Sequence, residues 1–360
     1  MKHPRGLAEA APSRQRSPSP VTCTIALDAM GGDHGPSVVV PAAVSALQRH
    51  QDLRLILVGD ESSVRGSLAG LPAIPADRLE IRHAEERVEM HDKPSTALRT
   101  KRNSSMRRAI DLVKAGEVAA CVSAGNTGAL MAIARFVLKT LPGIDRPAIC
   151  AMMPGRHQPT RVLDLGANVD SSSEELFRFA VMGSVLATAI DGKSSPRVAL
   201  LNVGEEEIKG NDTVKQAALL LDQSSLNYCG FAEGDDIFSG EFDVIVCDGF
   251  VGNIALKAAE GVASMLADIA RAEFRRSWWR KLGALCAAPA LRSLRDRADP
   301  RRYNGASLLG LRGIVIKSHG SADALSFGRA IDEAVSQVTQ AVPERISSLL
   351  EDLLVHEQVG

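Results

Sequence analysis

Six short turns rich in glycine and small polar residues each follow an apolar, strand-like run. They are Asp28–Asp33, Ser123–Gly128, Asp164–Asp170, Asn202–Asn211, Asp248–Asn253 and Ser318–Asp323. Open α/β sheets form binding sites where their strands end, and glycine lets a ligand approach the main chain closely. The six turns therefore predict one large polar cleft lined by backbone N–H groups, which bind anions. They contain no obvious nucleophile.

The turn Asp28–Asp33 stands between a predicted strand and a predicted helix. It matches neither the glycine pattern of dinucleotide-binding loops nor that of Walker A loops. It is therefore either a tight strand-to-helix connection or a loop that binds an anion or another polar ligand. Asp28 and Asp33 alone do not predict a metal site, because no partner histidine or carboxylate lies at ligand spacing.

The turn Ser123–Gly128 points more sharply to a ligand. Its small residues let the following helix direct its N-terminus at a phosphate. Ser123, Asn126 and Thr127 add side-chain donors at the same place. We therefore expect this turn to contact a ligand.

Lys209, Asn253 and His319 each allow two interpretations. Lys209 follows three glutamates, so it either neutralises a solvated loop or faces the cleft. Asn253 stands where a strand passes into a helix, so it either caps that helix or donates into the cleft. His319 either binds an anion or orders its own turn. A serine–histidine–aspartate triad would need a G-x-S-x-G turn, which the sequence lacks.

The composition is that of a soluble globular protein, with 45% hydrophobic and 24% charged residues. A net charge of −1 and only 4% aromatic residues argue against nucleic-acid binding. Six cysteines without a C-x-x-C pair predict buried, reduced thiols, no metal and a cytosolic compartment. No apolar run approaches the roughly 20 residues of a membrane span.

The first 20 residues, rich in proline, serine and arginine, predict a disordered extension at residues 1–20. From there the chain alternates strand and helix patterns over residues 21–354, which predicts an α/β protein with a parallel, doubly wound sheet. Strands are predicted at residues 22–27, 53–58, 118–122, 147–153, 161–164, 197–203, 228–232, 242–247 and 313–317. Helices are predicted at residues 36–48, 94–116, 128–139, 173–189, 213–222, 253–298 and 322–354, and a polar loop or edge strand at 82–91.

Residues 271–302 differ in charge from the rest of the chain, with ten basic residues and three acidic ones. Both tryptophans, Trp278 and Trp279, lie here, and Trp278 shares a helical face with Leu282 and Leu285. Tryptophan flanked by basic residues suits the surface of an anionic membrane. The alternative is a helix packed in a dimer interface. The two interpretations are compatible if the longer helix before this tip packs against a partner while the tip reaches lipid.

Taken in order, these motifs resemble the phosphate acyltransferases of bacterial phospholipid synthesis, also called acyl-carrier-protein:phosphate acyltransferases. The resemblance covers about Thr22 to Val342. It rests on the ordered series DAMGGDHGP, SSM, SAGNTGAL, DLGANVD, NVGEEEIKGND, VCDGFVGN and LLGLRGIVIKSHG. The sequence departs from the family pattern at Tyr303–Ser307, where a double glycine is expected, and in its arginine-rich N-terminal extension.

The resemblance implies a Rossmann-like α/β/α fold, similar to isopropylmalate dehydrogenase and phosphotransacetylase, with a protruding helical hairpin at residues 254–298. It also implies a homodimer in the cytoplasm that attaches transiently to the inner face of the membrane. The implied membrane contacts are Trp278, Trp279 and Leu282. Acyl carrier protein thioester and inorganic phosphate would give acyl phosphate, which a downstream glycerol-3-phosphate acyltransferase consumes, without cofactor or metal.

In this family the catalytic positions fall on Lys209 and Asn253. The other residues that we expect to contact substrate come from the glycine-rich turns. They are Asp28, Gly31, Gly32, Asp33, Ser123, Gly125, Asn126, Thr127, Gly128, Asn168, Asp248, His319, Gly320 and Ser321.

The implied chemistry accounts for the missing nucleophile, because phosphate is itself a nucleophile and a thiol with a pKa of about 8.5 is a good leaving group. The enzyme would position two substrates and stabilise a tetrahedral oxyanion. An acidic carrier protein needs a basic surface, either the hairpin or the basic helix. The candidate residues on that helix are Arg99, Lys101, Arg102, Arg107 and Arg108.

Three rival functions are weaker. A phosphotransacetylase acting on acyl-CoA would use a similar fold and chemistry. A nicotinamide-linked dehydrogenase lacks its cofactor fingerprint here. A membrane-surface scaffold would leave the six polar turns without a role.

Overall fold

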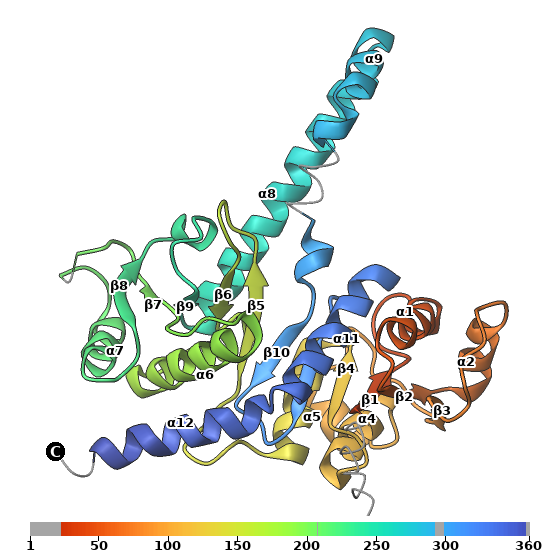
Figure 1. The fold of residues 1–360 in the computed structure, drawn as a ribbon, viewed down its shortest axis with the longest axis horizontal. Helices are drawn as coiled ribbons and strands as arrows, with labels where there is room; N and C mark the ends of the chain where they lie inside the picture. The colour runs from red at the N-terminus through yellow and green to blue at the C-terminus, as the bar shows by residue number, and fades with distance from the viewer. Residues whose placement is uncertain (1–22, 207, 292–298, 358–360) are drawn as a thin grey trace, which may run out of the picture.

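The computed structural model describes residues 23–206, 208–291 and 299–357. They form one sheet of eleven strands with helices packed on it, and a pair of helices projects from the body (Figure 1). The predicted α/β class is confirmed. The extension expected at residues 1–20 lies outside the described residues, as does the end of the predicted hairpin at 292–298.

The strand order across the sheet is β3-β2-β1-β4-β11-β10-β5-β6-β9-β7-β8. The strands are β1 Cys23–Asp28, β2 Leu53–Gly59, β3 Leu79–His83, β4 Ala120–Ser123, β5 Ala148–Met153, β6 Thr160–Leu163, β7 Val198–Leu201, β8 Tyr228–Ala232, β9 Val244–Val246, β10 Ala306–Leu309 and β11 Ile314–Lys317.

Several helices start at residues that favour a helix N-terminus. Pro36 occupies the first turn of α1, where its fixed φ suits a helix. Ser172 and Glu175 form a reciprocal capping box before α6. The helices are α1 Pro36–Arg49, α2 Glu61–Leu68, α3 Pro94–Thr100, α4 Ser105–Ala115, α5 Thr127–Leu138, α6 Ser173–Asp191, α7 Asp212–Asp222, α8 Gly249–Arg275, α9 Trp278–Cys286, α11 Ala324–Thr339 and α12 Val342–Glu357, with short 3-10 helices η1 Asp236–Phe238 and η2 Pro300–Tyr303.

The sheet reverses direction near its middle. Strands β1 to β4 and β11 run parallel to one another, and so do β6, β7, β8 and β9. Between these sets, β10 is antiparallel to β11 and β5, and β5 is antiparallel to β6. Three reversals make the two sets run in opposite directions. The expectation of a wholly parallel sheet is therefore wrong, because short connections join β5 to β6 and β10 to β11, and such connections pair strands antiparallel.

Several element boundaries also differ from the sequence expectation. The basic helix predicted at 94–116 is two helices, since Ser104 caps α4 and accepts a hydrogen bond from the Arg107 N–H. The predicted C-terminal helix is α11 and α12, which separate at Ala341, where φ is 49°. Strand β10 and helix α2 had no sequence prediction, because both are short.

Three clusters of buried apolar residues join the layers. Helices α1 and α11 cover one face of the β1–β4 half of the sheet, and α6 and α12 cover one face of the β6–β9 half. Helices α4 and α5 and the beginning of α8 share a third cluster on the opposite face. Neighbouring residues such as Val162 and Leu163 point into different clusters, as the alternation of a strand requires.

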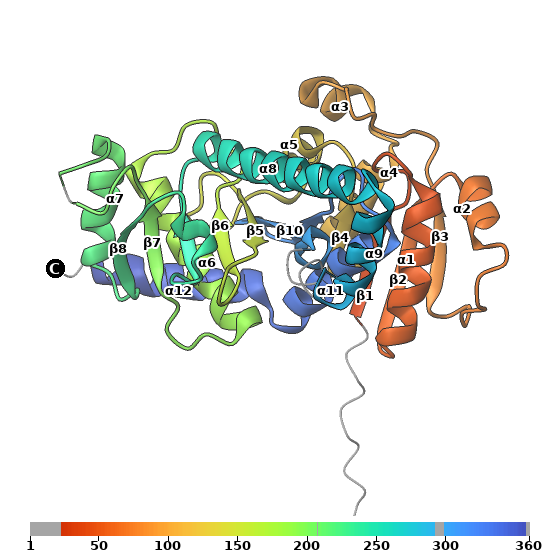
Figure 2. The same ribbon diagram turned by 90° about the horizontal axis from the view of Figure 1, so that it is seen from above.

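Helices α8 and α9 form an arm that leaves the body of the protein (Figures 1 and 2). Helix α8 has 27 residues. Among the described residues, it is the helix whose length and apolar composition would allow it to cross a membrane. The protein buries only 6% of its most apolar window. The sequence analysis predicted a helix here but no segment of membrane-span length, because charged residues such as Lys257 and Glu260 interrupt the apolar run.

Candidate active site

Asp28 is a buried carboxylate at the end of β1. It is 1% exposed and accepts hydrogen bonds of 2.6 Å from the hydroxyls of Ser105 and Ser123. Burial raises the pKa of Asp28, and the two hydroxyls and nearby backbone N–H groups oppose that rise. Its side chain therefore holds the ends of β1 and β4 and the start of α4 together.

The three turns that follow β1, β4 and β11 lie against one another. A Cβ on Gly31 would stand 2.8 Å from the Gly125 nitrogen, and one on Gly32 would stand 2.8 Å from the Gly320 carbonyl oxygen. The Asp33 N–H donates to that same carbonyl at 2.9 Å. Only glycine permits this approach, so these turns form one compact group.

Helix α5 begins at Thr127, directly after the β4 turn of this group. Asn126 caps it, because its Oδ1 accepts from the Ala129 N–H at 3.0 Å, while its Nδ2 donates to the carbonyls of Met90 and Asp92. The Asn126 side chain is thus engaged within the protein. Thr127 lies exposed in the first turn, where unpaired N–H groups of a helix favour anions.

His319 lies exposed beside the same group. Its Nδ1 accepts from the Ser321 N–H at 3.3 Å and lies 2.9 Å from the Ser321 hydroxyl. In the neutral ring these contacts assign the proton to Nε2, which is 3.9 Å from a carboxylate oxygen of Glu260 on α8. The His319 N–H donates to the side chain of Asn304, whose amide also donates to the hydroxyl of Ser318. His319 orders its own turn and also faces α8.

Asp164 organises the second half of the sheet much as Asp28 organises the first. It is fully buried at the end of β6 and accepts from the N–H groups of Ile149, Gly166 and Ala167. Both the N–H and the side-chain amide of Asn168 donate to it, at 2.7 and 3.0 Å. Burial raises the pKa of Asp164 against these donors. Asn168, predicted to contact substrate, is itself buried and serves this turn.

Helix α8 begins directly against the Asp164 turn. Asp248 caps it by accepting from the Val251 N–H at 2.9 Å. Gly252 lets the first turn lie on the Asp164 backbone, which a side chain would displace. Asn253 is therefore inside the helix, and its interpretation as a cap is wrong. Its exposed side chain lies beside Gly166, where a Cβ would be 3.5 Å from the amide oxygen.

Lys209 lies in the exposed loop after β7. Its ammonium pairs with the Glu206 carboxylate at 2.7 Å, and this hydrogen bond raises the pKa of Lys209. The Asn202 side chain closes the loop by donating to the carbonyls of Gly204 and Lys209. Strands β7 and β9 are parallel neighbours, so the loops carrying Lys209 and Asn253 leave the same edge of the sheet.

The strand directions divide the six turns into two groups of three. The turns after β1, β4 and β11 form one group, and those after β6, β7 and β9 form the other. One face of α8 touches both, because Asn253 lies beside Gly166 and Glu260 lies beside His319, with Lys257 between them at helical spacing. Seven residues of helix rise about 10 Å.

Known structures share this fold. A phosphotransacetylase from Streptococcus pyogenes has a TM-score of 0.60 and 19% identity, with 89% of this chain and 95% of that chain covered. The EutD phosphotransacetylase from Staphylococcus aureus has a TM-score of 0.58 and 17% identity, with 88% and 94% covered. The similarity confirms the fold expected from the sequence.

Sequence similarity reaches further than the fold. The family described as "Fatty acid synthesis protein" matches residues 23–345. A protein from Alkalilimnicola ehrlichii named phosphate acyltransferase is 61% identical over 335 residues, covering 93% of this chain and 98% of that protein. One from Methylococcus capsulatus with the same name is 60% identical over 330 residues, covering 92% and 97%. The chain belongs to the phosphate acyltransferase family. It is therefore an acyltransferase.

For this phosphate acyltransferase family member, the structure brings most of the predicted site residues to the two groups of turns. Asp28, Ser123 and Asn168 are buried and hydrogen-bonded within the protein, so they shape the turns. Thr127, Lys209 and Asn253 are exposed. No observation here tests their roles, which stay predictions.

Sequence reasoning gave no role to several residues that the fold places at these turns. Ser105 stands in the SSM motif, and Lys317 stands in the last motif beside His319. Asn304 falls in the segment where the sequence departs from the family pattern. No sequence motif marks Glu260 on α8 as a site residue, because only the packing of α8 brings it to His319.

Residues 23–206, 208–291 and 299–357 include no group of three histidine, cysteine or acidic residues that could hold a metal ion. The expectation that the reaction needs no metal or cofactor stays a prediction.

Proposed function

We propose that the protein reversibly transfers a fatty acyl group from an acyl carrier protein thioester to inorganic phosphate. The observation that supports this most directly is the face of α8 that touches both groups of turns. We assign the phosphate to the α5 N-terminus, whose turn packs against the His319 turn, and the thioester carbonyl to the surroundings of Asn253. Membership of the phosphate acyltransferase family supports the same reaction.

In this reaction a phosphate oxygen attacks the thioester carbonyl carbon and forms a tetrahedral oxyanion. The carbon–sulfur bond then breaks, the thiolate leaves with the carrier protein, and acyl phosphate remains. A cysteine nucleophile is not needed. Burial raises the thiol pKa of Cys23 to about 11 and that of Cys150 to about 12, and also raises those of Cys121 and Cys247. These four cysteines are therefore poor nucleophiles.

Lys209 and Asn253 have distinct proposed roles. The Lys209 ammonium orients phosphate or offsets developing negative charge, after exchanging its surface contact with Glu206 for the substrate. The Asn253 amide donates a hydrogen bond to the tetrahedral oxyanion. Removing such a donor typically lowers kcat about 10²–10³-fold.

The test is acyl phosphate formation by Lys209→Ala and Asn253→Ala. Lys215→Ala on α7 and Ser264→Ala on α8 are matched controls that remove side chains outside the six turns. Both site variants should lose most of kcat while the controls keep theirs. Near-normal rates in both site variants would overturn the assignment.

The acyl donor is tested separately by comparing initial rates with acyl carrier protein thioester and with acyl-CoA. A clear preference for the carrier protein is expected. Equal or faster turnover of acyl-CoA would instead indicate a phosphotransacetylase.

Carrier-protein docking is proposed on the basic surface of α3, α4 and α5. Lys101 pairs with Asp92 at 2.5 Å and Arg107 with Asp111 at 2.9 Å, so part of the predicted charge is neutralised. The exposed Phe136 ring offers an apolar contact between basic groups, since Arg107 and Lys139 lie 5.9 and 4.9 Å from its centre. Docking through such charges should weaken with salt.

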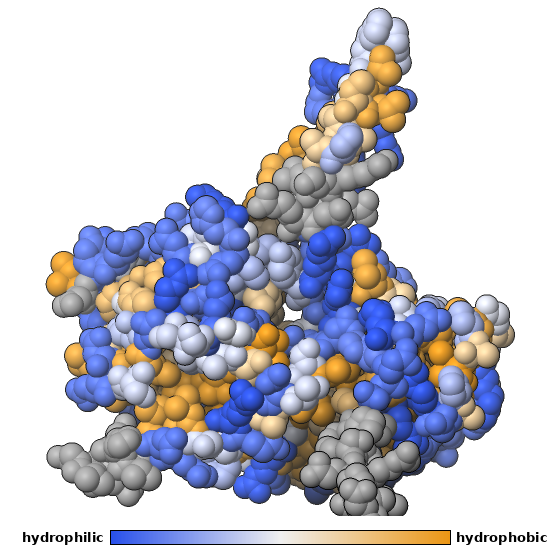
Figure 3. All heavy atoms as spheres, viewed as in Figure 1, coloured by the Kyte–Doolittle hydropathy of each residue, from blue (hydrophilic) through white to orange (hydrophobic). Residues whose placement is uncertain are grey.

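We further propose a cytoplasmic homodimer that attaches transiently to the inner face of an anionic membrane. Val262, Met265, Leu266 and Ile269 are each about half exposed and share one face of α8, which suits a second copy. At the tip, Trp278 and Trp279 stack with ring centres 3.5 Å apart, and Leu282 is exposed. Figure 3 shows apolar residues along this arm. Membrane attachment would deliver acyl phosphate to a downstream glycerol-3-phosphate acyltransferase.

A further inference from the structure

Lys317 is a buried lysine at the end of β11. It is 8% exposed, although lysine rarely leaves water unless its charge is paired. Its Nζ donates to the backbone carbonyls of Ala124, at 3.4 Å, and Ser318. These acceptors belong to the turns after β4 and β11. One ammonium therefore joins two of the six turns, beside the direct bond from the Ser318 N–H to the Ser123 carbonyl.

The two bonded carbonyls precede the segments to which we assign the phosphate. Ala124 leads through Gly125 and Asn126 into the N-terminus of α5, and Ser318 leads into His319. A shift of either carbonyl would move the N–H groups that follow it along the chain. The ammonium carries three N–H donors, and these two carbonyls occupy two of them.

Charged groups surround this ammonium from three elements. Asp28 on β1 and Asp33 in the following turn attract it, and Lys257 on α8 repels it. Burial is the largest effect and lowers the pKa of Lys317 to about 8. The Lys317 charge is therefore close to its titration range in mildly alkaline solution, where an ordinary lysine stays fully charged.

We propose that Lys317 is a positioning residue for phosphate, which holds the turns before α5 and before His319 so that their N–H groups face one anion. This rests on the proposed function, because phosphate is the acceptor there. The competing explanation is that Lys317 only neutralises the buried charge of Asp28.

Steady-state kinetics of Lys317→Met, Lys317→Arg and the double variant Asp28→Asn with Lys317→Met separate these explanations. Methionine keeps most of the length of the side chain without its charge, so the KM for phosphate should rise roughly ten-fold or more, the scale of a lost charge-assisted bond. The KM for the acyl donor should stay within about two-fold, and arginine should restore most of the phosphate affinity. The double variant should remain defective. Recovery in the double variant, or an unchanged KM in Lys317→Met, would overturn the proposal.

A pH profile gives a second test that does not depend on how well Lys317→Met folds. In the wild type the KM for phosphate should rise as pH passes about 8, because the neutral amine holds the two carbonyls by weaker bonds than the charged ammonium does. In Lys317→Arg this rise should disappear, since guanidinium stays charged. The ionisation of free phosphate affects both proteins equally. The same alkaline rise in both proteins would sink the proposal.

Phosphate binding can also be followed without turnover, by the increase in Tm that phosphate produces in the full-length protein. Wild-type protein should be stabilised by phosphate more than Lys317→Met, and equal stabilisation counts against Lys317. Wild-type protein that forms no acyl phosphate, yet is stabilised by phosphate through Lys317, would refute the proposed reaction and leave this inference standing.

Discussion

At the scale of single residues, two buried carboxylates hold the turns of the candidate site in place. Asp28 accepts from two serine hydroxyls, and Asp164 accepts from backbone N–H groups and Asn168. A buried carboxylate is tolerated only when donors surround it. Their position at strand ends explains why each half of the sheet keeps a fixed set of turns.

Replacing Ser123 by alanine should destabilise the protein by about 1–3 kcal/mol, because one oxygen of buried Asp28 loses its hydroxyl donor. The free energy of unfolding in urea measures this effect. Ser348→Ala, on the exposed side of α12, is the control and should change stability little. If both variants are equally stable, the Ser123 hydrogen bond does not support Asp28 as described.

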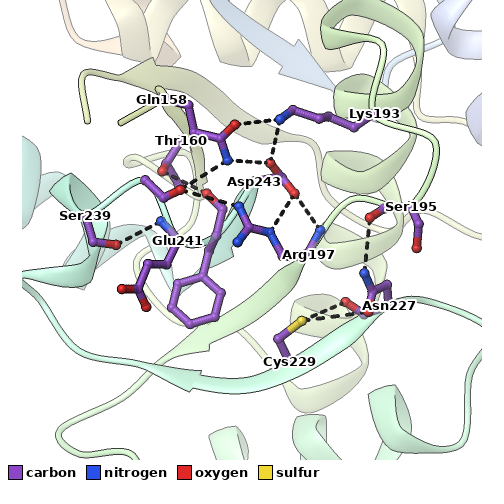
Figure 4. A network of polar contacts seen from close by, with 12 residues as sticks. Gln158, Thr160, Lys193, Ser195, Arg197, Asn227, Cys229, Ser239, Glu241 and Asp243 are labelled. Atoms are coloured by element: carbon purple, nitrogen blue, oxygen red, sulfur yellow. Dashed lines mark hydrogen bonds and ion pairs between the residues drawn. The ribbon is translucent and has the colours of Figure 1, made fainter. Parts of the chain in front are cut away.

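Asp243 anchors the opposite edge of the second half of the sheet (Figure 4). Its carboxylate contacts the amide of Gln158, the ammonium of Lys193, and both the N–H and guanidinium of Arg197. Burial alone would raise the pKa of Asp243, but these donors outweigh it and hold the pKa below its ordinary value. The network fixes the β5–β6 connection against β7 and the end of α6.

This network predicts a specific loss of stability in acid. The folded pKa of Asp243 is lowered, so its contribution is complete above the ordinary aspartate pKa of about 3.9 and is lost as pH falls through the folded value. The Tm of Asp243→Asn should therefore be lower near neutral pH but decline less steeply below about pH 4 than that of the wild type. Parallel Tm curves for the two proteins would contradict the assignment.

At the scale of elements, the two ends of α8 have different structural roles. Its first turns join the two groups of site turns, and its outer part projects from the body (Figure 1) and carries exposed apolar residues. Both follow from its length of 27 residues and from Gly249 and Gly252, which let it start deep against the Asp164 turn.

Replacing Trp278 and Trp279 together by alanine should weaken binding to anionic vesicles, because tryptophan prefers the membrane interface and basic residues flank this pair. Flotation with vesicles of anionic and of zwitterionic lipid measures the effect. Leu219→Ala removes an exposed apolar residue on α7, far along the sequence from the arm, and should float like the wild type. If the double variant floats as well as the wild type, Trp278 and Trp279 are not the membrane contact.

At the scale of the whole molecule, two half-sheets of opposite direction are held by elements that cross between them. Helix α11 packs on the first half, and α12 continues onto α6 in the second (Figure 1). Arg161 on β6 binds Asp191 at the end of α6 through two hydrogen bonds and also contacts Glu333 of α11 at 3.5 Å. The halves are thereby fixed relative to each other, as a site divided between them requires.

The exposed α8 face predicts a dimer that one charge can disrupt. Leu266→Glu places a carboxylate in the apolar face, so the protein should sediment as a monomer at concentrations where the wild type is a dimer. Leu219→Glu on α7 tests whether a charge alone has this effect and should leave the dimer intact. A dimeric Leu266→Glu protein would place the interface elsewhere.

Much of this architecture was predictable from local patterns. Strand β8 and helices α1, α5 and α7 fall within one or two residues of their predicted bounds, because hydrophobic periodicity and turn residues act over short distances. The order of the motifs along the chain is likewise enough to indicate the phosphate acyltransferase family. Local patterns did not reveal β10, whose four residues give too short a signal, or the position of Asn253 inside α8, which depends on where Asp248 caps the helix.

The sequence by itself determined the strand–turn–helix units, the family and the chemical character of the six turns. Only the tertiary structure decided that these turns form two groups, since strand direction depends on pairing between segments far apart in the chain. The burial of Lys317 was decided in the same way. A lysine after an apolar run is typical of an ordinary strand end, and only the packing of β4, β11 and Asp28 around it removes its charge from water.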